Sequence, residues 1–179
     1  VQMDGLVGSN GILPIKDSLD TIRDNFGNER YRLWATVFWL NGSDGALHFV
    51  CGLGLFLSVL LISGCWAPIA LFCLWICYLS LVVAGQDFLS FQWDILLLET
   101  GFLAIFLAPF QNFPKLSCQS SPSASVLWLH RWLLFRLIFA SGYVKLSSGD
   151  ETWKNLTALN YHYETQPLPT LIAWYVHQN

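Results

Sequence analysis

The residues best suited to chemistry in this chain are four charged side chains inside apolar runs. Asp94 and Glu99 lie in FQWDILLLETGFLAIFLAP, residues 91–109, and Arg131 and Arg136 lie in a later apolar run. A charge near the middle of a bilayer costs a few kcal/mol, so such residues usually pair with one another or line a polar cavity. The residue types allow a structural ion pair and a cavity for a substrate or proton alike.

Depth along the helices selects one of the pairs. With a rise of about 1.5 Å per residue, Glu99 lies about 16 Å in from residue 88. Arg136 lies about 15 Å in from residue 146, on the same side, because the two helices are expected to be antiparallel. We therefore predict a buried ion pair between Glu99 and Arg136.

The other two charges are expected nearer the ends of their helices. Asp94 lies only about 9 Å in by the same measure and is expected to reach Ser141, Tyr143 or water. Arg131 lies near the opposite end, where its long side chain can snorkel to the interface beside His130.

Three further residues suit acid–base chemistry. Lys145 ends the last apolar run, where it either snorkels to the interface or acts as a base with a lowered pKa. His162 and Glu164 share one face if LNYHYETQPLP, residues 159–169, is extended, although no third metal ligand accompanies them. The chain contains no GxSxG, Gly-rich phosphate loop or HExxH, so we predict neither a hydrolase nor a cofactor.

The five cysteines do not predict a metal centre. Cys73 and Cys77 are one helical turn apart but have no His or acidic neighbours, and Cys118 falls in a polar loop. We expect the others to be thiols buried in apolar surroundings: Cys51, Cys65, Cys73 and Cys77.

Membrane helices are the elements that must position these residues. The chain is 54% hydrophobic and only 12% charged, with a mean hydropathy of +0.47. Soluble domains carry about twice that share of charge, so the composition predicts an all-α, multi-pass transmembrane bundle. The nine basic residues form no cluster, which argues against nucleic acid as a partner.

Four apolar runs approach the roughly 20 residues that cross a hydrocarbon layer. They cover about 46–63, 67–85, 88–109 and 126–146. SGCWAP allows only a tight hairpin between the first two runs, and the Ser/Pro-rich loop 110–125 carries no visible chemistry. Residues 30–40, RYRLWATVFWL, favour a short interfacial helix, as does TLIAWYVHQ near the C-terminus.

Sidedness follows from the even number of spans, which places residues 1–45 and 147–179 together. The sequons at Asn41 and Asn155 both fall on that side and indicate the lumen of the secretory pathway, although Asn41 is close to the first span for a glycan. The basic residues favour the opposite orientation, because most lie on the sequon side: Lys16, Arg23, Arg30, Arg32 and Lys154, against Lys115. The chain starts without a basic-then-apolar leader, and we expect it to be part of a longer protein.

Three stretches resemble one known family. FQWDILLLETGFLAIFLAP, RWLLFRLIFASGYVKL and W-x-x-L-T-A-L-x-YHYETQPLPT are similar to the lipase maturation factor family, and GLVGSNGILP resembles the segment after that family's first span. The resemblance implies a multi-pass protein of the endoplasmic reticulum membrane that assists folding and assembly of secreted lipases such as lipoprotein lipase. It places 1–45 and 147–179 in the lumen, where lipase clients would meet Tyr161, His162, Tyr163 and Glu164.

A looser likeness supports an alternative. The order of spans, and G-Y-V-K-L followed by a Trp, is similar to the membrane region of the vitamin K-dependent gamma-carboxylase, in which a lysine near this place acts as a base. That resemblance implies an integral-membrane enzyme or lipid-binding protein that uses Lys145. Two hypotheses therefore stand: a non-enzymatic maturation factor whose partners are lipases and membrane lipids, and a membrane enzyme.

Overall fold

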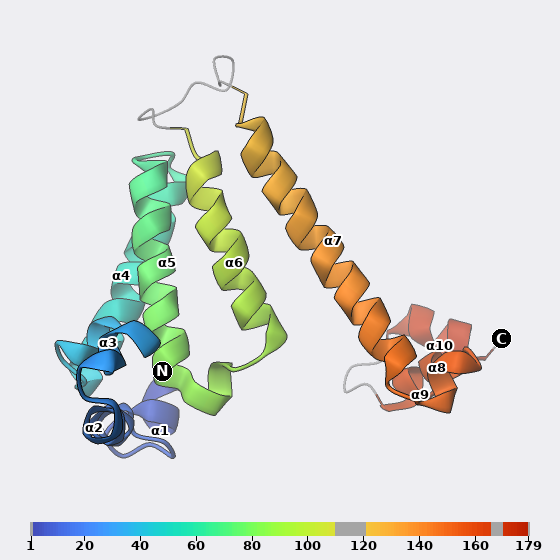
Figure 1. The fold of residues 1–179 in the computed structure, drawn as a ribbon, viewed down its shortest axis with the longest axis horizontal. Coiled ribbons are helices and arrows are strands. Elements are labelled where there is room, and N and C mark those ends of the chain that lie inside the picture. Colours follow the sequence, from blue (N-terminus) through green and yellow to red (C-terminus); the bar gives the residue numbers. More distant parts are fainter. Residues whose placement is uncertain (1, 110–120, 166–169, 179) are drawn as a thin grey trace. The chain divides into compact units, whose positions relative to one another are not determined.

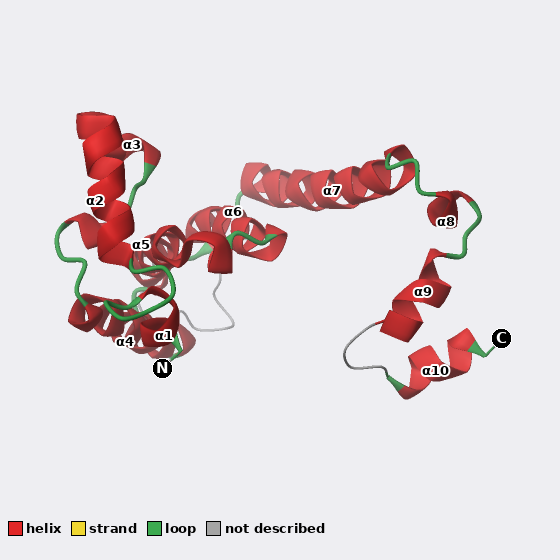
Figure 2. Cartoon of the chain, turned by 90° about the horizontal axis from the view of Figure 1, so that it is seen from below, coloured by secondary structure: helices red, strands yellow, loops and turns green. Residues whose placement is uncertain are grey.

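The computed structural model describes residues 2–109, 121–165 and 170–178, and every regular element in them is helical (Figures 1 and 2). The predicted all-α class is therefore confirmed for the described part of the chain. The chain divides into two compact units, Val1–His130 and Arg131–Asn179. Each unit is described by itself.

A helical hairpin forms the centre of the first unit. Helices α4 (Asp44–Ile62) and α5 (Ala67–Gly85) have 19 residues each and pack along their length. The four residues between them make the predicted tight hairpin, with Trp66 in the left-handed region at φ 50°. Within the described residues, two stretches are long and apolar enough to cross a membrane, Asp44–Ile62 and Ala67–Leu89.

Helix α6 (Gln92–Leu107) packs against α5 after the short 3-10 turn η3 (Gln86–Leu89). The indole Nε1 of Trp75 donates to the carbonyl of Leu98 at 2.9 Å, and a Cβ at Gly101 would lie 3.6 Å from the same indole. Gly101 therefore faces the indole of Trp75, whose hydrogen bond holds α6 against α5. With 16 residues, α6 is about 24 Å long, shorter than the predicted run 88–109 because η3 takes up the start of that run.

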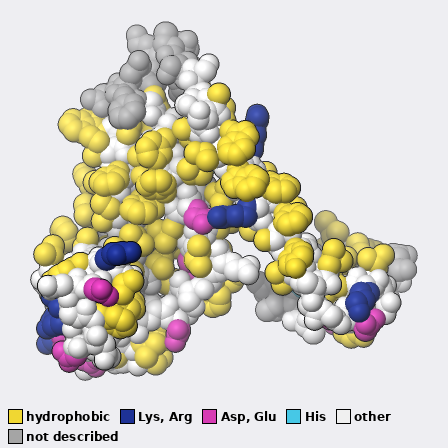
Figure 3. Space-filling view, viewed as in Figure 1, with side chains coloured by type: hydrophobic (Ala, Val, Ile, Leu, Met, Phe, Trp, Pro, Cys, Tyr) yellow, Lys and Arg dark blue, Asp and Glu magenta, His cyan; other side chains and the backbone are white. Residues whose placement is uncertain are grey.

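The N-terminal segment folds over one end of this bundle (Figure 1). It contains short helical elements: α1 (Met3–Val7), α2 (Ile15–Phe26), η1 (Gly27–Glu29), α3 (Arg30–Leu33) and η2 (Val37–Trp39). Its apolar side chains join those of α4 and α5 in one core, which includes Val7, Ile15, Leu19, Phe38, Leu47 and Val50. Figure 3 shows hydrophobic side chains covering the helices of the bundle, whereas charged side chains gather over the N-terminal segment.

One sequence expectation for this segment needs correction, and one helix was not predicted. The short helix expected over 30–40 is limited to Arg30–Leu33, followed by the 3-10 turn η2. Helix α2, which has 12 residues, was not predicted. The signal was present, because Ile15, Leu19, Ile22 and Phe26 follow the spacing of one helix face.

The second unit contains most of the long helix α7 and three short helices. Helix α7 (Ala124–Ser147) has 24 residues and begins within the first unit. It is followed by α8 (Glu151–Lys154), α9 (Ala158–Thr165) and α10 (Leu171–His177). Helix α10 matches the predicted short C-terminal helix, and its N-cap Thr170 accepts a hydrogen bond from the backbone N–H of Ala173.

Candidate functional site

The first notable polar contact lies between α5 and α6. Asp94 sits in the first turn of α6 and is only 4% exposed. The phenol of Tyr78 on α5 donates a hydrogen bond to its Oδ1 at 2.6 Å, whereas its Oδ2 is buried without a hydrogen-bond partner. The first turn also suits a carboxylate because the helix dipole is positive there. Asp94 therefore fastens α6 to α5.

This partner differs from those expected for Asp94, which were Ser141, Tyr143 or water. Among the four apolar runs only the third and fourth contain charged residues, so the predicted partners of Asp94 lie in the fourth. Tyr78 lies seven residues before the end of α5 at Gly85, about 10 Å along the axis. The same count applied to the second run would have placed Tyr78 level with Asp94.

Buried Ser80 fastens the N-terminal segment to α5. Its Oγ accepts a hydrogen bond from the backbone N–H of Val37 at 3.1 Å and donates to the carbonyl of Ile76 at 2.8 Å. The hydroxyl of Thr36 donates to the carbonyl of Ser80 at 3.5 Å. Ser80 is only 1% exposed, so its hydroxyl supplies the acceptor that the first N–H of η2 needs.

Further hydrogen bonds join the N-terminal segment to the first residue of α4 and to the residue that follows α5. Ser9 donates twice to the carboxylate of Asp44, from its backbone N–H at 2.7 Å and from its Oγ at 2.6 Å. Ser18 Oγ donates to Gln86 Oε1 at 2.8 Å. None of these polar groups is arranged as a nucleophile with an adjacent base. The hydrogen bonds therefore stabilise the packing of the N-terminal segment.

The predicted ion pair joins residues of different units. Glu99 lies half-buried on α6 in the first unit, and Arg136 lies on α7 in the second. Their pairing therefore stays a prediction, as does the snorkelling of Arg131. His130 donates from Nδ1 to the carbonyl of Val126 at 2.9 Å, one turn earlier in the same helix.

Lys145 lies at the exposed end of α7. Its Nζ stands 4.7 Å from the ring centroid of Trp153, a cation–π geometry. A lysine that serves as a base is normally desolvated, since burial lowers its pKa. The exposed ammonium and its aromatic neighbour have the arrangement of an interfacial lysine, while a catalytic role for Lys145 stays untested.

The predicted His162–Glu164 face is wrong, because the segment is helical. Residues two apart in a helix are separated by about 200°, so these side chains point to different sides of α9. Glu164 instead approaches α10, where its Oε1 lies 3.3 Å from Nε2 of His177. Tyr161 and His162 are exposed, and Tyr163 is half-buried. No group of three or more His, Cys, Asp or Glu side chains in the described part could hold a metal ion.

The whole chain, residues 1–179, matches a family model described as the lipase maturation factor transmembrane domain. The chain belongs to the lipase maturation factor family. The resemblance seen in the sequence is thereby confirmed, and the description as a transmembrane domain agrees with the apolar helices α4 and α5.

The chain covers only part of the length of the curated family members that it matches. Lipase maturation factor 2 of Xenopus laevis is 46% identical over 99% of the chain, which covers 26% of that relative. The human protein of the same name is 43% identical over 98% of the chain, and lipase maturation factor 1 of Mus musculus is 39% identical over 99%. The chain covers 27% of the human protein and 32% of the Mus musculus protein. No solved structure gives a significant match.

The two sequons of this family member lie in different surroundings. Asn155 is exposed at the end of α8, in the second unit. Asn41 is also exposed, but its Oδ1 accepts the backbone N–H of Ser43 at 3.0 Å, immediately before α4 begins. Whether either sequon carries a glycan stays a prediction.

The cysteines correct one expectation. Cys77 is buried and Cys65 and Cys73 are half-buried, all as free thiols. Cys51 is a free thiol as well, but it is exposed on α4 rather than buried. Cys118 lies outside the described residues.

Proposed function

We propose that the protein containing this chain is a membrane factor of the endoplasmic reticulum that assists folding, assembly and secretion of lipases such as lipoprotein lipase. The match of the family model to all 179 residues carries the proposal, together with relatives named lipase maturation factor. The proposed role is non-enzymatic, and the polar groups that fasten the helices to one another suit a scaffold. The chain spans about a quarter to a third of these relatives, so the role belongs to the full-length protein.

In this proposal residues 46–146 cross the membrane four times and residues 1–45 and 147–179 are lumenal. The four apolar runs correspond to α4, α5, α6 and α7. Lipase clients would meet the exposed side of α9, which offers Tyr161 and His162 beside Tyr163 and Glu164. Membrane lipids would surround the apolar helices.

The test is a rescue assay with the full-length parent protein in cells that lack the family. The readout is secreted lipase activity per unit of parent protein. We expect the wild type and Lys145→Ala to rescue equally, and the double variant Tyr161→Ala, His162→Ala to rescue several-fold less. Asn160→Ala, an exposed neighbour on α9, is the matched control and should rescue fully.

Two outcomes contradict the proposal. If the wild type rescues no lipase, lipases are not the clients of this protein. If Lys145→Ala is as abundant as the wild type but inactive, the alternative of a membrane enzyme or ligand site at Lys145 replaces the non-enzymatic role.

A further inference from the structure

Two adjoining pockets lie where the N-terminal segment meets α4. The first has a volume of about 570 Å³ and is almost wholly apolar, lined by side chains such as Val37, Phe38, Phe49, Leu53, Cys73 and Cys77. The second has a volume of about 390 Å³ and is lined by Lys16, Asp20 and Arg23 of α2. Both pockets belong to the first unit.

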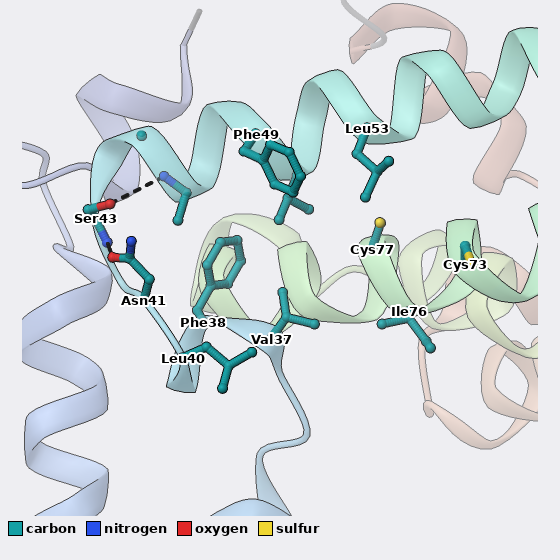
Figure 4. Close-up of a pocket in the computed structure, with 13 residues that line it drawn as sticks. Val37, Phe38, Leu40, Asn41, Ser43, Phe49, Leu53, Cys73, Ile76 and Cys77 are labelled. Carbon is teal, nitrogen blue, oxygen red and sulfur yellow. Dashed lines mark hydrogen bonds between the residues drawn. The ribbon is translucent and has the colours of Figure 1, made fainter.

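The two pockets adjoin each other and share four lining residues. Phe38, Leu40, Asn41 and Ser43 line both of them. Figure 4 shows Asn41 and Ser43 at one end of the apolar pocket and Cys73 at the other, with Phe49 and Leu53 on the α4 side. An occupant that reaches past these shared residues would contact a polar chamber and an apolar one.

The apolar pocket runs along a helix that is apolar enough to cross a membrane. Its lining on α4 extends from Gly45 to Leu53, about 12 Å along the helix axis. The polar pocket lies before α4 begins, in the N-terminal segment. The junction between the pockets thus coincides with the start of a candidate span, where headgroups and acyl chains of a bilayer meet.

The charge of the polar pocket is positive. Arg23 is held by Asp20, with Nη1 3.0 Å from Oδ1, and this ion pair is half exposed. Lys16 is exposed and has no ion-pair partner among the described residues. Two cations and one carboxylate leave one positive charge, which matches the single negative charge of a phosphodiester.

We infer that the two pockets bind one phospholipid of the surrounding bilayer, with an acyl chain in the apolar pocket and its phosphate beside Lys16. A free phosphate would leave the apolar pocket unexplained, and a neutral diacylglycerol would leave the cationic pocket unexplained. An amphiphile with a phosphate at the chain end, the main lipid of a bilayer, suits both chambers. The inference does not depend on any lipase, since it concerns a lipid contact of the membrane domain.

The test measures the phospholipid retained by the full-length protein, purified in mild detergent, by mass spectrometry of the intact complex. The probes are a phosphatidylcholine and a diacylglycerol with the same acyl chains. Lys16→Gln should lower retention of the phosphatidylcholine about fivefold, since a basic residue near a lipid phosphate contributes about 1 kcal/mol. Arg32→Gln removes an exposed charge outside both pockets and should leave retention unchanged.

A second variant tests the apolar pocket without weakening the fold. Gly45 lines the pocket, and a Cβ there would meet only Ser43 Oγ at 3.8 Å, so the backbone leaves room for a side chain, and Gly45→Leu should narrow the pocket. Leu has the higher helix propensity, and thermal unfolding of the variant beside the wild type separates lost stability from lost lipid. Gly52→Leu makes the same exchange at an exposed position of α4 outside the pocket and is the matched control.

A phosphatidylcholine with a photoreactive group in its acyl chain locates the site. We expect crosslinks to peptides containing Phe49, Cys73 or Cys77, and fewer of them in Gly45→Leu. Crosslinks elsewhere only, equal retention of the diacylglycerol, or unchanged retention in Lys16→Gln and Gly45→Leu would each overturn the inference. The inference would also be overturned if another segment of the full-length protein fills the pocket in place of a lipid.

Discussion

The hydroxyl of Tyr78 lies 2.6 Å from Oδ1 of Asp94 and links the second long helix of the bundle to the third. The carboxylate is buried, and its second oxygen has no hydrogen-bond partner. Tyr78 is therefore the hydrogen-bond donor on which this carboxylate depends within the described residues. The contact explains how an acidic residue is accommodated in the run that begins at Phe91.

Removing the phenol should destabilise the bundle. Tyr78→Phe leaves both oxygens of buried Asp94 without a donor, which should lower the free energy of unfolding by about 1–3 kcal/mol. The measurement is thermal unfolding of the purified parent protein in detergent. In Asp94→Leu the same Tyr78→Phe exchange should cost less, because the carboxylate is gone. Equal losses in both backgrounds would mean that the hydrogen bond is not the cause.

The hydroxyl of Ser80 should matter for the attachment of the N-terminal segment. Ser80→Ala leaves the N–H of Val37 without its acceptor in a buried place, with an expected loss of about 1–3 kcal/mol. Limited proteolysis should then cut the segment before α4 faster than in the wild type. Ser90→Ala is the control, because Ser90 is exposed and donates only to the nearby carbonyl of Asp87. Unchanged cleavage in Ser80→Ala would contradict the fastening role.

A pH effect is expected at the start of α8. The backbone N–H of Thr152 and then its hydroxyl donate to Asp150, at 2.9 and 2.8 Å, and hold the pKa of that carboxyl below its ordinary value. A lowered folded pKa means that the cap stabilises α8 fully above the unfolded pKa of about 3.9. This stabilisation is lost as the pH falls through the folded pKa.

Hydrogen exchange of the peptide around Thr152, expressed as a protection factor, measures this effect. Protection should be constant above about pH 5 and fall below pH 4, where Asp150 takes up its proton. Asp150→Asn keeps an acceptor but does not titrate, so its protection should show no such step. A step of the same size in that variant would assign the effect to another group.

The sidedness of the chain can be read from its two sequons. We expect a glycan at Asn155, because it is exposed in the proposed lumenal segment, and none at Asn41, which immediately precedes α4. Treatment with an endoglycosidase should therefore shift the mass of the parent protein and of Asn41→Gln by the same amount. If other sequons of the parent are first removed, Asn155→Gln should abolish the shift. A glycan lost only in Asn41→Gln would contradict the assignment.

Local patterns were enough to predict the helical class and the positions of the long helices. The runs 46–63 and 67–85 differ from α4 and α5 by at most two residues at each end, because a continuous apolar stretch bounded by turn residues fixes where a helix begins and ends. Helix α2 was within reach of the same reasoning, but its apolar face is short. The motifs shared with the lipase maturation factor family were also readable from the residues alone, since family membership is a property of the sequence.

Only the tertiary structure decided which side chains meet. The pairs Tyr78–Asp94 and Ser80–Val37 join residues 16 and 43 positions apart. Depth along the helices allows Tyr78 as a partner of Asp94 but does not choose it over Ser141 or Tyr143, and no spacing rule connects Ser80 with Val37. The helical state of α9 likewise separated His162 from Glu164 and brought Glu164 to His177. Hydrophobic periodicity depends on neighbours in the chain, whereas the partner of a buried polar group depends on how the helices pack. That packing determines both the Asp94 contact and the adjoining pockets beside α4.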